Sequence, residues 1–196
     1  MKRIAVFCGS STGNDNDYSV AAESLGSALV KNEMGLVFGG GSIGLMGIIA
    51  RSVLKNGGEV VGVIPEALFK KQLALQGLTD LRIVGSMHER KAVIADLSDG
   101  FIAMPGGIGT IEEIFEALTW TQLGIHTKPC GFLNIRNYFN HLIEFLDHMS
   151  DQNFIDEKHR AMIIMEEYPE LLLTKIKSYR HQEVDKSAWA LNMLKG

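Results

Sequence analysis

The sequence predicts an α/β protein of the Rossmann-like, doubly wound type, with a mostly parallel sheet of about seven strands and helices on both faces. The first observation is that short, uniformly apolar runs alternate with longer amphipathic runs, which is typical of parallel strands buried on both faces. The second is that glycine-rich turns directly follow three of the apolar runs, at 9–13, 39–47 and 105–109. Ligands of such folds bind beyond the carboxyl ends of the strands, so these turns are where we expect function.

The elements of the first half follow from apolar runs and the residues that stop them. Gly9 ends the first apolar run, the triplet Gly39-Gly40-Gly41 breaks the second, and Pro65 closes the third. Asn56-Gly57-Gly58 is the stop signal of a helix. The segment 66–80 predicts a short helix and a loop. In chain order we expect a strand at 4–8, a helix at 18–31, a strand at 35–38, a helix at 43–55 and a strand at 60–64.

The second half continues the same alternation. Pro105-Gly106-Gly107 closes its second apolar run, and the longer runs between strands have helical spacing. In chain order we expect a strand at 81–84, a helix at 87–98, a strand at 101–104, a helix at 110–123, a strand at 130–133, a helix at 138–149, a strand at 162–165 and a helix at 169–179. The 196 residues are typical of one compact domain, spanning 1–196, in which 181–196 is a C-terminal tail without a clear period.

Composition excludes several classes of function. There are 23 acidic and 19 basic residues, a formal net charge of −4, so no basic surplus is available to neutralise nucleic-acid phosphates. No apolar stretch reaches the ~18 residues that a membrane-spanning helix needs. Two cysteines, Cys8 and Cys130, are too few for a disulfide scaffold and are expected in the core. We therefore expect no nucleic-acid or membrane partner and a cytoplasmic location.

The turn Gly39-Gly40-Gly41-Ser42-Ile43-Gly44 matches the G-x-G-x-x-G pattern between a strand and a helix. Glu66, after the next strand, stands about where a ribose-binding acid lies in dinucleotide-binding folds. The turn follows the second strand, however, whereas the usual fingerprint follows the first. An NAD-dependent oxidoreductase, another nucleotide-related role and simple turn geometry all remain open for this motif.

The turn Pro105-Gly106-Gly107-Ile108-Gly109-Thr110 carries a stronger signal. Its glycines let backbone N–H groups point at one anion, the helix N-terminus adds partial positive charge, and Thr110 supplies a hydroxyl. At 100° per residue, Glu112, Glu116 and Thr119 share a polar stripe, with Glu113 further round. Thr110-x-x-Glu113 is also the pattern of a capping box, which needs no ligand, so both interpretations of Glu113 stay open.

The segment Ser86-Met87-His88-Glu89-Arg90-Lys91 opens the helix after the fourth strand. Ser86 and Glu89 form a capping box. Arg90 and Lys91 oppose the helix dipole at a cost of up to ~1 kcal/mol each, which a bound anion or carboxylate at the sheet edge would offset. The alternative is that both cations face solvent or pair with Glu89.

The other polar residues give weaker indications of function. His88 is expected to be structural or on the surface, and His126, in a loop after Gly124, is expected to be exposed. The six histidines show no metal-ligand spacing with cysteines or acids. We therefore expect no metal and no cofactor. Trp120 and Leu123 belong to a helix that fits an interface and a core position equally well.

These motifs together resemble those of the LONELY GUY (LOG) family of cytokinin riboside 5′-monophosphate phosphoribohydrolases. The resemblance rests on M-H-x-R-K at Met87–Lys91 and P-G-G-x-G-T-x-x-E at Pro105–Glu113, and extends over roughly 4–150. It implies a Rossmann-like, usually dimeric protein that hydrolyses the N-glycosidic bond of an N6-substituted AMP, or of AMP, to free base and ribose 5-phosphate. Some homologues are labelled lysine decarboxylases, but no pattern here supports pyridoxal phosphate chemistry.

The resemblance also implies residue roles. Glu113 and Arg90 match the catalytic pair of the family, with Glu113 stabilising an oxocarbenium-like transition state. The expected substrate-binding residues are Lys91, Gly106, Gly107, Ile108, Gly109, Thr110, Glu112 and Thr119. The sequence departs from plant members at Gln72, where a gap-free alignment from Pro65 to Lys91 places their substrate-contacting Glu. The alternative function is a non-catalytic module that binds a nucleotide or molybdenum cofactor; retention of both Arg90 and Glu113 disfavours it.

Overall fold

The computed structural model describes residues 1–71 and 73–181 and contains a seven-stranded sheet in the order β4-β3-β2-β1-β5-β6-β7. Every pair of neighbouring strands is parallel. The strands are β1 (Arg3–Phe7), β2 (Gly35–Phe38), β3 (Val60–Pro65), β4 (Asp80–Val84), β5 (Gly100–Ala103), β6 (Cys130–Leu133) and β7 (Ile163–Glu166). The predicted doubly wound fold is confirmed, and its sheet is parallel throughout.

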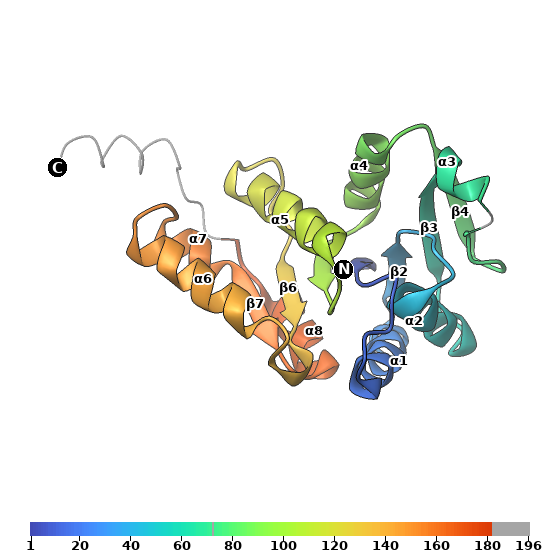
Figure 1. Ribbon diagram of the computed structural model, residues 1–196, viewed down its shortest axis with the longest axis horizontal. Coiled ribbons are helices and arrows are strands. Elements are labelled where there is room, and N and C mark those ends of the chain that lie inside the picture. The colour runs from blue at the N-terminus through green and yellow to red at the C-terminus, as the bar shows by residue number, and fades with distance from the viewer. Residues whose placement is uncertain (72, 182–196) are drawn as a thin grey trace.

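Helices cover both faces of the sheet, as Figure 1 shows for α4 and α5 on one side and α1 and α2 on the other. The first face carries α1 (Asn16–Lys31), α2 (Gly44–Lys55) and α8 (Pro169–Ser178). The second carries α4 (Met87–Leu97), α5 (Ile108–Gln122) and α6 (Asn140–Asp151). The short elements are α3 (Glu66–Phe69), the 3-10 turn η1 (Ile135–Asn137) and α7 (Glu157–Ala161).

Two apolar layers hold the helices against the sheet because side chains alternate across each strand. In β1, Ile4 and Val6 pack toward α1 and α2, whereas Ala5 and Phe7 pack toward α4 and α5. The middle strands are therefore buried on both sides, which explains why their sequences are apolar without alternation.

The strand order changes direction at β1, which lies between β2 and β5. The loops that leave β1 and β5 therefore diverge from a common crevice, the usual ligand position in this fold class. A hydrogen bond from the Gly9 N–H to the Pro105 carbonyl (3.0 Å) joins these two loops. The fold thus brings two of the three predicted glycine-rich turns together.

Most predicted elements agree with the structure to within one or two residues, and the differences have local causes. The helix expected at 110–123 begins earlier, at Ile108, because Gly107 takes the extended cap position. The helix expected at 18–31 begins at Asn16 because the Asp15 carboxylate caps the Asp17 N–H (2.9 Å). The turn η1 and helix α7 were not predicted, since neither is long enough to show a period. Gln72 and the tail from 182 lie outside the described residues.

Candidate active site

A cavity of about 380 Å³ lies at the carboxyl edge of the sheet, between the starts of α4 and α5. Its size is within the usual range for sites that bind small molecules. It is lined by Cys8, Gly9, Ser10, Met46, Met87, Arg90, Gly107, Ile108, Gly109, Thr110, Glu112 and Glu113. The structure thus brings Arg90 and Glu113, predicted from separate motifs, to one cavity.

The start of α4 is fixed by the predicted capping box. The Ser86 hydroxyl accepts a hydrogen bond from the Glu89 N–H (3.1 Å), and the Glu89 carboxylate accepts one from the Gly85 N–H (2.7 Å). Glu89 is therefore occupied by the cap, and both cations find partners elsewhere. This excludes the alternative in which Arg90 and Lys91 pair with Glu89.

The Arg90 guanidinium is held on three sides. Its Nε donates to the Val63 carbonyl (3.1 Å), and its Nη1 lies 2.9 Å from Glu113 Oε1. Its Nη2 occupies the space beside Gly39, where an added Cβ would come within 2.0 Å. The first glycine of the G-x-G-x-x-G turn is therefore needed to make room for Arg90.

Gly44, the last glycine of that turn, also serves packing. Gly44 has a positive φ of 60°, and a Cβ there would lie 2.2 Å from the Ser10 carbonyl carbon. The next amide, Leu45 N–H, donates to the Gly9 carbonyl (3.0 Å), so the start of α2 supports the loop after β1. The turn follows β2, away from the switch at β1, and this position disfavours a dinucleotide site there.

Glu113 is an almost buried carboxylate, with 12% of its side chain exposed, facing an Arg90 side chain that is 11% exposed. Among the described residues, Oε1 has no aligned hydrogen bond, so its attraction to Arg90 is mainly Coulombic. Burial raises the pKa of the Glu113 carboxyl, and the charge of Glu112 adds to this, against the opposing effects of Arg90 and Lys91. A carboxylate with a raised pKa beside a cavity is suited to accept a proton.

Glu113 does not act in a capping box. Because α5 begins at Ile108, Thr110 is already the third helical residue, and Glu113 lies too far along the helix to reach its cap. The capping interpretation is therefore wrong. The first backbone bond at this end runs from the Ile111 N–H to the Gly107 carbonyl (3.3 Å), so the amides of 108–110 are the ones that a helix leaves without intrahelical partners. Such amides form a natural anion site.

Lys91 joins α4 to α5 through two carboxylates. Its Nζ lies 2.6 Å from Glu112 Oε1 and 3.0 Å from Glu116 Oε1. The hydrogen bond to Glu112 raises the pKa of the ammonium group, and Glu116 adds to the effect. The predicted polar stripe of α5 therefore neutralises Lys91, and Glu116 belongs to this cluster although it was not predicted as a site residue.

Some predicted residues lie at the edge of this arrangement. Gly106 packs against Thr110, whose Oγ1 would be 2.1 Å from an added Cβ. Thr119 is exposed, donates its hydroxyl to the Phe115 carbonyl (2.7 Å), and is not part of the cavity lining. The lining residues that were not predicted as site residues are Cys8, Gly9, Ser10, Met46 and Met87. Gly9 and Ser10 could have been found from their place after the first strand; the two methionines carry no such signal.

The histidines lie outside the cavity. His88 is exposed. The expectation that His126 is exposed is wrong, because its ring is half-buried and stacks on Phe101 (5.3 Å between centroids); burial lowers its pKa to about 4, which keeps the ring neutral. Residues 1–71 and 73–181 contain no group of three or more His, Cys, Asp or Glu placed to hold a metal ion. Over the same residues, no helix has the length and apolar character to cross a membrane.

The comparison with known sequences identifies the family. The family described as "Possible lysine decarboxylase" matches residues 46–176. The chain is 44% identical over 197 aligned residues to cytokinin riboside 5′-monophosphate phosphoribohydrolase LOG1 of Arabidopsis thaliana, covering 99% of this chain and 92% of that protein. The chain belongs to the LOG family. It is also 43% identical to the LOG3 enzyme of the same plant, over 99% of this chain and 92% of that protein.

Solved structures show where the LOG fold recurs. A molybdenum cofactor binding protein from Rippkaea orientalis has a TM-score of 0.68 and 21% identity, covering 90% of this chain and 96% of that one. The molybdenum cofactor carrier protein of Chlamydomonas reinhardtii also has a TM-score of 0.68, with 18% identity, covering 91% of this chain and 99% of that one. At such identities the likeness concerns the fold alone, whereas the LOG relatives match nearly the whole chain at 43–44% identity.

Proposed function

We propose that this LOG-family hydrolase cleaves the N-glycosidic bond of N6-substituted adenosine 5′-monophosphates or of AMP, releasing free base and ribose 5-phosphate. The substrate class comes from the named activity of its relatives at 41–46% identity. The observation that carries the proposal is the Arg90–Glu113 pair, which lies in the same cavity as the N-terminus of α5. An anion site and a buried carboxylate one helical turn apart fit a phosphorylated ribose.

The roles of the site residues follow from this placement. The amides of 107–110 and the Thr110 hydroxyl would hold the 5′-phosphate. The ribose would then lie beside Glu113, whose negative charge stabilises the oxocarbenium-like carbon as the bond to the base breaks. Glu113 would also accept a proton from the water that attacks C1′ and then release it to solvent, while the departing base takes up a proton from solvent at nitrogen.

The neighbouring cations set the state of this carboxylate. Arg90 favours the ionised form of Glu113 in a place where burial opposes it. Lys91 is neutralised by Glu112 and Glu116 and lies outside the cavity lining, so its part in substrate binding is proposed on the family resemblance. Glu112 lines the cavity and would be available to ribose hydroxyls. Thr119 is proposed as a substrate contact on the family resemblance alone, since it lies outside the cavity lining.

A chromatographic assay for free base tests the proposal. Purified protein would be incubated with N6-isopentenyl-AMP, AMP, the matching nucleosides and N6-isopentenyl-ATP. We expect release of base from monophosphates only, and loss of release in Glu113→Gln with nucleotide binding retained. No base from any substrate with folded protein would overturn the proposal and would favour a nucleotide-binding module.

We further propose a homodimer and a cytoplasmic location. Exposed apolar side chains at the end of α5, Leu123 (55% exposed) and Ile125 (65%), support an interface there. The two buried, unpaired cysteines are compatible with a reducing compartment. Light scattering on a sizing column tests the first proposal, and the second is tested by fractionating the source cells.

A further inference from the structure

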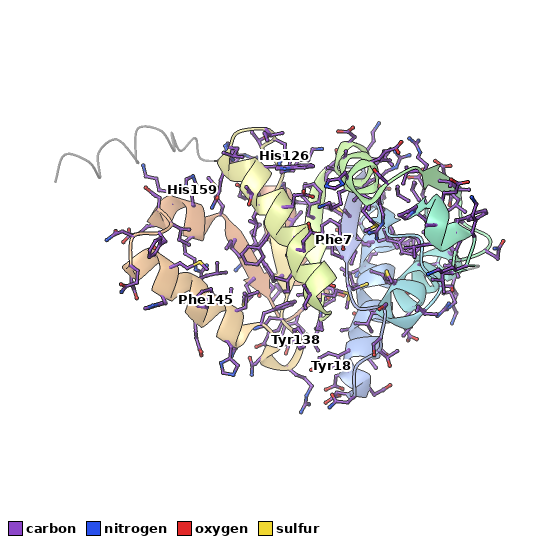
Figure 2. The ribbon with its side chains drawn as sticks, turned by 45° about the horizontal axis from the view of Figure 1, so that its top comes forward. Phe7, Tyr18, His126, Tyr138, Phe145 and His159 are labelled. Atoms are coloured by element: carbon purple, nitrogen blue, oxygen red, sulfur yellow. The ribbon has the colours of Figure 1, made fainter. Side chains whose placement is uncertain are left out.

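Tyr138 touches the anion loop from a distant part of the chain. Its hydroxyl donates a 2.6 Å hydrogen bond to the Gly106 carbonyl, which lies 32 residues away in sequence. Its ring packs edge-on against Tyr18, with 5.9 Å between ring centroids, and against Phe139, at 5.0 Å. Figure 2 shows Tyr18 and Tyr138 beside each other at the lower edge of the molecule. The ring is thus packed between Tyr18 and Phe139, and its hydroxyl donates to the Gly106 carbonyl.

That carbonyl belongs to a peptide bond whose orientation little else fixes. The peptide joins Gly106 to Gly107, and neither residue has a side chain to restrict it. An added Cβ on Gly106 would collide with Thr110, whereas one on Gly107 would meet nothing within 4 Å. The loop is therefore closely packed at Gly106 and has free space beside Gly107. The hydrogen bond from Tyr138 therefore favours one orientation of a peptide that no side chain of its own restricts.

The orientation matters because the two ends of a trans peptide point in opposite directions. When the Gly106 carbonyl points toward Tyr138, the Gly107 N–H points away from it. Tyr138 lines a pocket of about 310 Å³ beside the loop, whereas Glu113 lines the site cavity, of which Tyr138 is not a lining residue. Gly107 lines both. The hydroxyl of Tyr138 therefore directs the Gly107 N–H away from itself, and Gly107 is a residue that also lines the site cavity.

The turn that carries Tyr138 is itself held in an uncommon conformation. Arg136 and Asn137, directly before it, have positive φ angles of 51° and 59°. Such angles are rare for a residue like Arg and recur at functional sites. The Arg136 guanidinium is tied to the start of α1, at 2.9 Å from Asp15 and 3.1 Å from Asp17. This cross-link keeps η1, and with it Tyr138, against the loop.

We propose that Tyr138 is a positioning residue, which fixes the Gly106–Gly107 peptide so that the Gly107 N–H takes part in binding the 5′-phosphate. The proposal rests on the proposed function for the identity of the anion. It adds Tyr138, the residue directly after η1, to a site that the motifs place on α4, on α5 and on the loop before α5.

The test compares Tyr138→Phe, which removes only the hydroxyl, with the wild type. We expect the KM for the monophosphate and the Kd for ribose 5-phosphate to rise about tenfold, which corresponds to the loss of one hydrogen bond. The kcat should change less than about twofold, because the phosphate contact is the same in the ground and transition states. Tyr168→Phe is the matched control, since that residue is exposed at the start of α8, far along the chain from the site.

A spectroscopic readout keeps the proposal testable independently of turnover. The amide resonance of Gly107 should shift when ribose 5-phosphate is added to the wild type, and shift much less in Tyr138→Phe. Unchanged affinity and an unchanged Gly107 shift in a folded variant would overturn the role of Tyr138. If the wild type binds ribose 5-phosphate but releases no base, the proposed hydrolysis fails while the role of Tyr138 is still measured.

Discussion

Arg90 Nη1 lies 2.9 Å from Glu113 Oε1, and this contact joins the first turns of α4 to α5. Each side chain is nearly buried, so each is the main compensating charge of the other. The two residues that would perform the chemistry therefore also hold the site together. Substitutions at either position will change both activity and stability, and the two effects need separate measurements.

Substitution of Arg90 by Ala leaves a buried carboxylate without its cation. We expect the free energy of unfolding to fall by about 3 kcal/mol, because breaking a buried ion pair from one side exposes the full desolvation cost. We expect kcat/KM to fall at least ~100-fold, a usual effect of removing a preorganised charge. Denaturant unfolding and the free-base assay measure the two effects. Unchanged kcat/KM in Arg90→Ala would remove Arg90 from the active site.

Substitution of Gly39 by Ala tests whether the glycine-rich turn serves Arg90. The new methyl group would occupy the place of Arg90 Nη2, so the guanidinium must move away from Glu113. We expect Gly39→Ala to reproduce much of the activity loss of Arg90→Ala although no charge is removed. Gly85→Ala is a suitable control, because its Cβ would meet only the flexible end of Glu89, at 3.3 Å. Wild-type kinetics in Gly39→Ala would show that the position of Arg90 is not critical.

The pH dependence of activity should report the environment of Glu113. If the ionised carboxylate is required, activity rises as the pH passes through the pKa of Glu113. Because burial raises this pKa, the rise in activity should occur above the ordinary value of 4.5. The charge of Glu112 raises this pKa and that of Lys91 lowers it. The rise in activity should therefore move to lower pH in Glu112→Gln and to higher pH in Lys91→Met. Profiles of kcat/KM against pH measure the shifts. Shifts in the same direction would contradict an effect of charge.

The contribution of Glu113 to folding stability should also depend on pH, but it should fall as pH rises, whereas activity increases. The pKa of Glu113 is higher in the folded than in the unfolded chain, so the folded state binds the proton more tightly. This contribution is complete below 4.5 and is lost as pH rises through the folded pKa. The melting temperature of Glu113→Gln should therefore increase relative to the wild type as pH rises from 4 toward 8. A constant difference would mean that Glu113 titrates normally.

The sequence indicated the site because two of its residues, Arg90 and Lys91, have charges that disfavour their positions in a helix. Arg90 and Lys91 stand in the first part of a helix, where cations are unfavourable, and the structure supplies their carboxylate partners on α5. The sequence pattern also placed the glycine-rich turns correctly, because a parallel sheet has the carboxyl ends of all its strands at the same edge. What pattern could not supply was the partner of each cation, since pairing depends on the packing of α4 beside α5.

Other features needed the coordinates because their cause is not local. The start of α5 could not be fixed, since Gly107 acts as cap through its backbone and Ile108, 89% exposed, begins the helix without apolar burial. The left-handed Arg136 pairs with Asp15 and Asp17, more than 100 residues earlier, and no local pattern indicates either feature. Met46 and Met87 line the cavity although nothing in the sequence distinguishes them from core methionines.

The last prediction concerns Lys91 and its two carboxylate partners, and it distinguishes an effect on substrate binding from an effect on stability. Lys91 has 15% of its side chain exposed and lies between Glu112, which is 52% exposed, and Glu116, which is 29% exposed. We expect Glu116→Gln to lower the free energy of unfolding by about 1 kcal/mol, because it removes a charged partner from a largely buried ammonium. Glu112→Gln should cost less stability, since solvent screens that carboxylate, but should raise the KM more if Glu112 meets the ribose.

A double-mutant cycle with Lys91→Met distinguishes a direct contact from a general effect of charge. The coupling energy between Glu116 and Lys91 should account for most of the loss in Glu116→Gln. Glu66→Gln is the matched control, because its 2.8 Å pair with Lys70 is exposed on both sides and should contribute no more than about 0.5 kcal/mol. Equal losses in Glu116→Gln and Glu66→Gln would show that burial of Lys91 does not strengthen the pair. A larger loss at Glu116 with an unchanged KM would make this carboxylate a support of the α4–α5 contact, which leaves Glu112 as the acid of the cluster that faces substrate.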